Sequence, residues 1–182
     1  MYYQIIKVGK VEIGLVWCYA GKKPRMEYIY LPNPKAELKK RIVKDYREVN
    51  KIPRKIPGGI DDRIAKLYFG KKENIDLSLL NLSKLTDFSA RVLKQTCKIP
   101  RGKVATYSGL AAKLGKSHAA RAVGTALANN PFPIIIPCHR VVRADGSLGG
   151  FGGGLKMKKE LLLKEGIITD QKGKVSGKYF HL

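Results

Sequence analysis

The chain has 182 residues, of which 44% are hydrophobic, so it can bury a core and is not disordered throughout. No stretch approaches the roughly 20 apolar residues of a membrane-spanning helix, and the first residues lack the features of a signal peptide, so we expect an intracellular protein. The 36 Lys and Arg residues against 14 Asp and Glu residues produce a formal net charge of +22. This excess is typical of proteins that bind nucleic acid, although a lysine-rich surface kept for solubility would also explain it.

Three cysteines, Cys18, Cys97 and Cys138, are widely spaced and form no Cys-x-x-Cys pair. An odd number with this spacing argues against a disulfide framework and against a four-cysteine zinc site. The N-terminal part also lacks a cluster of Cys and His residues. We therefore expect free thiols, no metal and no cofactor.

Residues 1–80 are predicted to form a small α/β domain. Stretches rich in Val, Ile, Trp and Tyr between Gly-containing turns are typical of strands, and apolar residues at helical spacing after Pro34 indicate a helix. No motif in this domain indicates a site. The predicted elements are strands within residues 3–31, including 11–19 and 26–31, and helices over 34–48 and 61–69.

Residues 84–168 are predicted to form a second, mainly α-helical domain. A first helix begins at Thr86 and ends near residue 100. Thr106 is expected to cap a second helix, over residues 107–114, which stops at Gly115, and Ser117 to cap a third that runs from 118 to 129. Two short helices joined by a Gly-containing turn form a helix-turn-helix pattern, which occurs in DNA-binding proteins and also in ordinary bundles.

The remainder of the second domain leads through an apolar segment, 134–136, into Cys138. We expect that segment to be a buried strand or an extended stretch. A glycine-rich loop over 146–154 and a last helix over 155–164 follow, and residues 169–182 form a basic C-terminal tail that we expect to be loosely ordered from Lys172. The predicted fold class is thus an α/β N-terminal domain plus a mainly α C-terminal domain with a helix-turn-helix and an active-site loop.

Cys138 is the candidate nucleophile. A buried cysteine is most often only a small hydrophobic residue, but this one stands where an apolar segment emerges into a loop, close in sequence to His139, Arg140 and Arg143. Positive neighbours lower the pKa of a thiol from about 8.5 and favour the thiolate, which is the nucleophile. Adjacent residues of an extended segment point to opposite sides, so a water or a backbone turn would have to link Cys138 to His139.

The third helix of the second domain consists almost entirely of small residues around one arginine, Arg121. Alanine is simply a good helix former, and small faces allow close helix packing, which explains the small residues without any function. Against DNA, however, Ala120, Ala122 and Gly124 would permit close approach. Arg121 would then reach the groove or the base stack.

Residues 86–166 resemble the C-terminal domain of the O6-alkylguanine-DNA alkyltransferase family. Five motifs occur in the family's order, which makes the resemblance specific. The N-terminal half agrees with the family only in its size and α/β character. The motifs are Tyr107 after the helix cap, Ala-Arg-Ala-Val-Gly at 120–124, Asn-Pro-Phe-Pro at 130–133, Pro-Cys-His-Arg-Val-Val at 137–142 and Glu-Gly at 165–166.

The resemblance implies a catalytic role for four residues. Cys138 would accept the alkyl group, His139 would deprotonate it through a water, and Glu165 would orient His139. Asn130 would join the recognition helix to the active-site segment by hydrogen bonds.

The resemblance also implies which residues contact DNA and the damaged base. Arg121 would fill the stack that the base leaves, and Tyr107 would crowd the phosphate and help to rotate the nucleotide outward. Phe151 stands where many members carry Tyr, and Gly152 where some carry Ser, which leaves the range of accepted alkyl groups open. The expected DNA contacts are Arg121, Tyr107, Ala120, Ala122 and Gly124, and the expected pocket residues are Tyr107, Pro133, Val141, Phe151 and Gly152.

The implied activity is a suicide transfer of the alkyl group from guanine O6 in double-stranded DNA to Cys138, with one turnover per molecule. We expect a monomer that binds no membrane and is cytoplasmic or nucleoid-associated, or nuclear in a eukaryote. One alternative is a damage-binding protein without chemistry, against which Cys138 argues. Another is a helix-turn-helix regulator that senses methylation, but this would need a further metal-binding domain and polar base-reading side chains.

Overall fold

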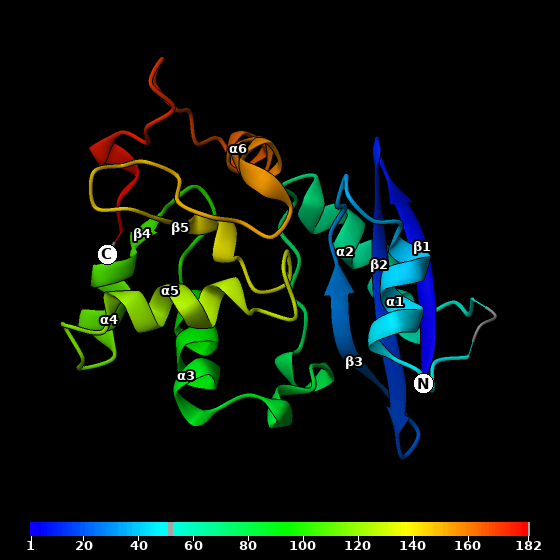
Figure 1. Ribbon diagram of the computed structural model, residues 1–182. Coiled ribbons are helices and arrows are strands. Elements are labelled where there is room, and N and C mark those ends of the chain that lie inside the picture. The colour runs from blue at the N-terminus through cyan, green and yellow to red at the C-terminus, as the bar shows by residue number, and fades with distance from the viewer. Residues whose placement is uncertain (51–52, 182) are drawn as a thin grey trace.

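The computed structural model describes residues 1–50 and 53–181; residues 51 and 52 of the predicted first domain and residue 182 of the predicted tail lie outside this description. An N-terminal part built on a three-stranded sheet lies beside a C-terminal part built mainly from helices (Figure 1). The predicted arrangement of an α/β N-terminal part and a mainly α-helical C-terminal part is confirmed. In the described ranges, no helix has the length and apolar character needed to cross a membrane.

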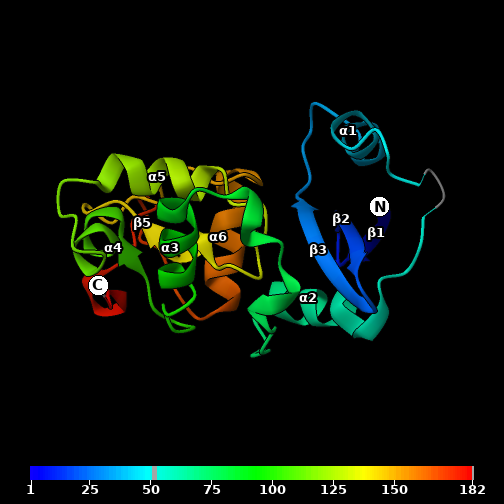
Figure 2. The same cartoon turned by 90° about the horizontal axis from the view of Figure 1, so that it is seen from below.

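The N-terminal sheet is antiparallel, in the order β1 (Tyr2–Val8), β2 (Val11–Ala20) and β3 (Lys23–Tyr30). Side chains alternate along a strand, so both faces of β2 need cover. Leu15 packs in the cluster that includes Ile64 of α2 (Ile60–Tyr68), and Val16 packs in the cluster that includes Ile42 of α1 (Leu38–Asp45). The sheet therefore lies between the two helices (Figure 2).

Two predicted boundaries in this part are wrong. The third strand begins at Lys23, because it pairs with β2 directly across the tight turn at residues 21–22. The first helix covers only Leu38–Asp45 instead of 34–48. The Asn33 side chain accepts a hydrogen bond from the Lys35 backbone N–H at 2.9 Å, and this local turn competes with helix at the predicted start.

The C-terminal part contains four helices and a short parallel strand pair. The predicted caps are confirmed where Thr86 accepts from the Ser89 N–H at 3.2 Å and Thr106 accepts from the Gly109 N–H at 2.8 Å. Gly115 ends the second of these helices with a φ of 70°. The elements are α3 (Asp87–Thr96), β4 (Ala105–Thr106), α4 (Tyr107–Lys113), α5 (Ala120–Ala128), β5 (Val141–Val142) and α6 (Gly154–Lys164).

The expected cap at Ser117 is wrong. Helix α5 begins at Ala120, with Ala119 at its N-cap and no side-chain hydrogen bond there. The Ala119 N–H instead donates to the Lys116 carbonyl at 2.8 Å, so a backbone turn occupies the residues that were expected to open the helix.

Further short 3-10 turns lie at Pro57–Gly59, Leu77–Leu79, Leu82–Lys84, Cys138–Arg140 and Gly177–Tyr179.

The apolar segment before Cys138 is buried, as predicted, but it is a turn and not a strand. The Ile136 N–H donates to the Phe132 carbonyl at 2.8 Å, and Ile134 adopts a φ of 75°. A positive φ is unusual for a β-branched residue. The apolar composition reflects burial here, and the turn directs the chain toward the cysteine.

The C-terminal tail is folded back on the domain, so the expectation of loose order is wrong. Its backbone forms hydrogen bonds with both backbone groups of Val104. The Val104 N–H donates to the Tyr179 carbonyl at 2.9 Å, and the Val104 carbonyl accepts from the His181 N–H at 2.8 Å. Val175 is buried in a cluster with Leu162 of α6. Apolar contacts and backbone hydrogen bonds therefore outweigh the repulsion among the tail's lysines.

One hydrophobic core continues from the N-terminal part into the C-terminal part. It joins Trp17 and Ile29 of the sheet to Phe132 and Leu161. The Ile29 N–H also donates to the Pro131 carbonyl at 2.8 Å. Strand β3 is thereby held against the segment that leads from α5 to Cys138.

Candidate active site

Cys138 lies at the base of a cavity of about 670 Å³. It opens the short 3-10 turn Cys138–Arg140 and is 9% exposed. Helices α4 and α5 and the glycine-rich loop surround it. The wall residues from these elements include Tyr107, Arg121, Gly124, Leu127, Gly149, Phe151 and Gly152.

Asn130 connects the end of α5 to the cysteine. Its Nδ2 donates to the Cys138 Sγ at 3.2 Å and to the Ile136 carbonyl at 3.3 Å, and its Oδ1 accepts from the Phe132 N–H at 3.0 Å. The Asn130 side chain is buried, so water does not compete for these hydrogen bonds. A donor aimed at sulfur stabilises the thiolate more than the neutral thiol.

Burial raises the pKa of the Cys138 thiol, because a thiolate loses hydration inside the protein. The Asn130 hydrogen bond, the charge of Lys158 and the backbone N–H groups of Cys138 and His139 act in the opposite direction. Before the reaction, Cys138 is therefore a neutral thiol. The groups that would stabilise its thiolate are already in position around the sulfur. A base must remove the proton when the reaction begins.

His139 is placed to be that base. Its Nε2 lies 3.1 Å from Oε1 of Glu165, and both side chains are buried. Burial lowers the pKa of His139 despite the neighbouring carboxylate, so the ring is neutral near pH 7. The other ring nitrogen, Nδ1, is buried without a hydrogen-bond partner in the described part of the protein.

Glu165 is a carboxylate shared by two partners. The Arg140 guanidinium forms a bidentate ion pair with it, donating to one carboxylate oxygen at 2.8 Å and to the other at 2.7 Å. Burial alone would raise the pKa of Glu165, but the bonds from His139 and Arg140 outweigh burial and bring the pKa to about 2. Arg140 also donates to the Ile99 carbonyl at 2.8 Å, so its guanidinium pairs with Glu165 and the backbone, whereas it was expected to favour the thiolate of Cys138.

Lys158 of α6 is a cation that lowers the pKa of the Cys138 thiol, and sequence reasoning missed it. The side chain is fully buried, and its Nζ donates to the Val141 carbonyl at 2.6 Å and to the Leu148 carbonyl. It thereby ties the glycine-rich loop to the segment that follows Cys138. Lys158 falls three and four residues before the buried Leu161 and Leu162, and a lysine at that core-facing position was the available signal.

Of the residues expected to face DNA, Tyr107, Arg121 and Gly124 line the cavity, whereas Ala120 and Ala122 do not. Arg121 and Ala122 are exposed on α5, Ala120 is half-buried, and Gly124 lies beside the Tyr107 ring. Gly149 approaches Tyr107 from the opposite side. A Cβ at position 149 would lie 2.7 Å from the Tyr107 hydroxyl oxygen, so any side chain there would displace the ring.

Most of the expected pocket residues surround Cys138. Tyr107, Phe151 and Gly152 line the main cavity, and Pro133 lines a smaller cavity that adjoins it. The Val141 side chain is fully buried in β5 and lines neither cavity, so only its backbone groups, through which the resemblance implies that it reads the base, are candidates for contact. In the described ranges, no three His, Cys, Asp or Glu side chains lie close enough together to hold a metal ion.

Fold and site together define a protein with a single buried nucleophilic cysteine beneath a pair of short helices. Residues 87–167 match the family model described as "6-O-methylguanine DNA methyltransferase, DNA binding domain". A methylated-DNA–protein-cysteine methyltransferase of Methanothermobacter thermautotrophicus is 43% identical over 160 residues, which cover 88% of this chain and 82% of the relative. The Salmonella typhimurium enzyme of the same name is 34% identical and covers 86% and 92%.

Solved structures agree with this likeness. The crystal structure of Mycobacterium tuberculosis OGT in complex with DNA superposes with a TM-score of 0.74 at 31% identity, covering 91% of this chain and 93% of the other. The O6-methylguanine-DNA methyltransferase of Pyrococcus kodakaraensis has a TM-score of 0.68 at 31% identity, covering 91% and 99%. The chain belongs to the methylated-DNA–protein-cysteine methyltransferase family.

Proposed function

We propose that this protein repairs double-stranded DNA by moving the alkyl group of O6-alkylguanine to its own Cys138. The observation that carries the proposal is a buried cysteine at the bottom of a cavity wide enough for a nucleobase. Asn130 donates a hydrogen bond to its sulfur, and the His139–Glu165 pair lies beside it. These parts are a nucleophile, its base and the group that orients the base.

The chemistry is a displacement at the alkyl carbon. His139 Nδ1 takes the thiol proton through a water, and Glu165 stabilises the imidazolium that forms. The sulfur then forms a bond to the alkyl carbon while the bond from that carbon to guanine O6 breaks, and guanine leaves with the electron pair and is reprotonated. The product is a thioether that no group of the site can cleave, so each molecule acts once.

We propose that α4 and α5 bind the duplex as a helix-turn-helix, with α5 against a groove. The O6 substituent lies inside the base stack, so the nucleotide must rotate into the cavity, at a cost of a few kcal/mol. The alanines of α5 allow close approach, and Arg121 occupies the space that the base leaves. The large positive charge supplies affinity for the phosphates.

The test is the mass of the intact protein after it is mixed with duplex DNA that carries O6-methylguanine, followed by peptide mapping. One added methyl group on Cys138, saturating at one per protein molecule, is the expected result. Tight binding without added mass would show that the protein recognises damage without repairing it. Methyl groups in excess of one per molecule would contradict the single turnover.

Arg121→Ala should slow the reaction with duplex DNA about tenfold or more, because base rotation loses the side chain that fills the stack. The reaction with free O6-methylguanine, which needs no rotation, should change much less. Single-turnover rates on the two substrates measure this difference. Arg63→Ala, an exposed arginine on α2 and far from the cavity, is the matched control. Equal losses on both substrates would contradict the role of Arg121 in base rotation.

A further inference from the structure

A second, smaller cavity of about 70 Å³ adjoins the main cavity at Cys138. The two cavities share the Cys138 side chain and parts of α5 and the glycine-rich loop, so both reach the reactive cysteine. The shared residues are Leu127, Ala128, Cys138, Phe151 and Gly152. Its remaining wall comes partly from the N-terminal domain. The residues from that domain are Tyr28, Ile29, Leu31 and Arg41.

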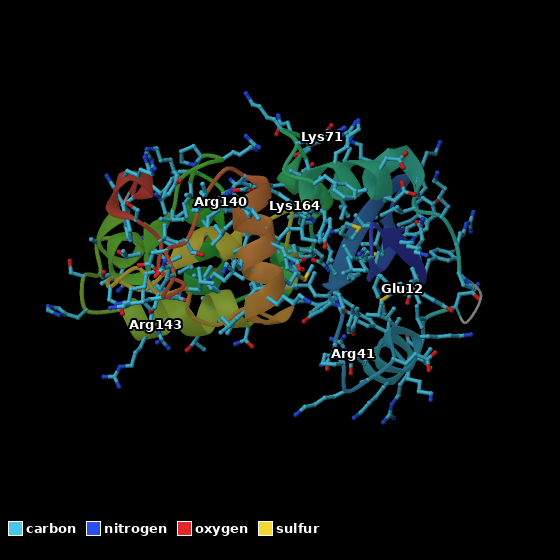
Figure 3. The ribbon with its side chains drawn as sticks, turned by 90° about the horizontal axis from the view of Figure 1, so that it is seen from above. Glu12, Arg41, Lys71, Arg140, Arg143 and Lys164 are labelled. Atoms are coloured by element: carbon cyan, nitrogen blue, oxygen red, sulfur yellow. The ribbon has the colours of Figure 1, made fainter. Side chains whose placement is uncertain are left out.

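Arg41 is held in place by its neighbours. It lies on α1 (Figure 3), and its guanidinium donates to the Leu31 carbonyl at 2.8 Å and stacks 5.0 Å from the centre of the Tyr30 ring. The Tyr30 hydroxyl in turn donates to the Asp45 carboxylate at 2.8 Å, which fixes the ring on which the guanidinium stacks. Arg41 is the one arginine, lysine, aspartate or glutamate among the residues that line the cavity.

Two contacts fix the N-terminal wall of the small cavity relative to the segment that carries Cys138. The hydrogen bond from the Ile29 N–H to the Pro131 carbonyl joins β3 to the chain three residues beyond the end of α5. Leu31 fits against Gly153 of the glycine-rich loop, where a Cβ would lie 3.2 Å from its Cδ1. Both contacts hold the small cavity at a constant position relative to Cys138.

Reaction geometry determines what this cavity can receive. In the displacement, the sulfur, the alkyl carbon and guanine O6 lie in line, so any further substituent on that carbon projects sideways from the line. The base itself requires the main cavity. The small cavity also reaches Cys138, so it is the space left for such a substituent, and Arg41 lines it.

We propose that the N-terminal domain forms a specificity-determining wall of the repair site, and that Arg41 favours lesions whose alkyl group carries a carboxylate, such as O6-carboxymethylguanine. A guanidinium pairs with a carboxylate through two parallel hydrogen bonds, which a methyl group cannot form. The inference rests on the proposed alkyl transfer and concerns only which alkyl groups react fastest.

The test compares three lesions in the same duplex: O6-methylguanine, O6-carboxymethylguanine and its neutral amide analogue, O6-carbamoylmethylguanine. The wild-type protein should react with the carboxylate about tenfold faster than with the amide, as expected for a hydrogen bond to a charged group. Arg41→Met should abolish this preference and slow the methyl lesion by a smaller factor. Arg41→Lys should keep part of the preference, and Arg63→Met should behave as wild type.

Each preference is a ratio of two rates measured on one variant, so a partly unfolded preparation does not distort it. Equal slowing of all three lesions in Arg41→Met would overturn the inference and make Arg41 a packing residue. A wild-type protein that shows no preference for the carboxylate would also overturn it. If the wild type transfers no methyl group at all, the proposed function itself fails, and the inference fails with it.

Discussion

Replacing Cys138 with serine should abolish alkyl transfer, by at least about 10⁴-fold, in the range seen when an enzyme loses its nucleophile. A hydroxyl is far less acidic than a thiol, and the neutral His139 is too weak a base to ionise it. Serine is nearly the size of cysteine, so the hydrogen bond from Asn130 and the cavity should persist. The variant should therefore still bind DNA that contains O6-methylguanine.

Intact-protein mass and a binding titration on the same DNA measure the two properties. Cys97→Ser is the matched control, because burial raises the pKa of the Cys97 thiol to about 11 and makes it a poor nucleophile. The control should gain one methyl group, as the wild type does. A Cys138→Ser protein that still gained a methyl group would show that another residue accepts the alkyl group.

Lys158→Met should slow alkyl transfer about 100-fold, for two reasons that act together. The charge of Lys158 lowers the pKa of Cys138, and its Nζ joins the glycine-rich loop to Val141. Burial lowers the pKa of Lys158 itself to about 8, so it is still mostly protonated at neutral pH. Methionine fills similar volume but supplies neither the charge nor the hydrogen bonds.

The rate at which iodoacetamide modifies Cys138, measured against pH, separates the charge from the packing. Loss of a nearby positive charge disfavours the thiolate, so the pKa of Cys138 should rise in Lys158→Met. Lys159→Met, which removes an exposed neighbour on the same helix, should leave the profile unchanged. A lower transfer rate with an unshifted thiol pKa would mean that Lys158 acts only through the loop.

Local signals in the sequence were sufficient for much of the C-terminal part. Thr86 and Thr106 predicted helix starts because a cap is made within three residues of the chain. Gly115 predicted a helix end because a left-handed residue is needed at that point alone. Cys138 was identified by the motifs around it, and the structure places it, Asn130, His139 and Glu165 together.

Local signals failed where distant partners decide the conformation. Ser117 has the side chain of a cap, but a backbone turn from Lys116 to Ala119 occupies its place. The apolar segment 134–136 was expected to extend, yet burial on all sides allows a turn equally well. The basic tail was expected to be loose, because charge is visible in the sequence and its packing partner at Val104 is not.

The sequence by itself predicted Cys138, its neighbour His139 and the pair of short helices, because each is encoded in a short run of residues. Only the tertiary structure decided which charges act on which groups. The Arg140 side chain pairs with Glu165, while Lys158, twenty residues from Cys138, lowers the pKa of the thiol. Arg41 reaches the same site from the other domain. Electrostatic effects depend on distance in space and on burial, and neither is set by distance along the chain.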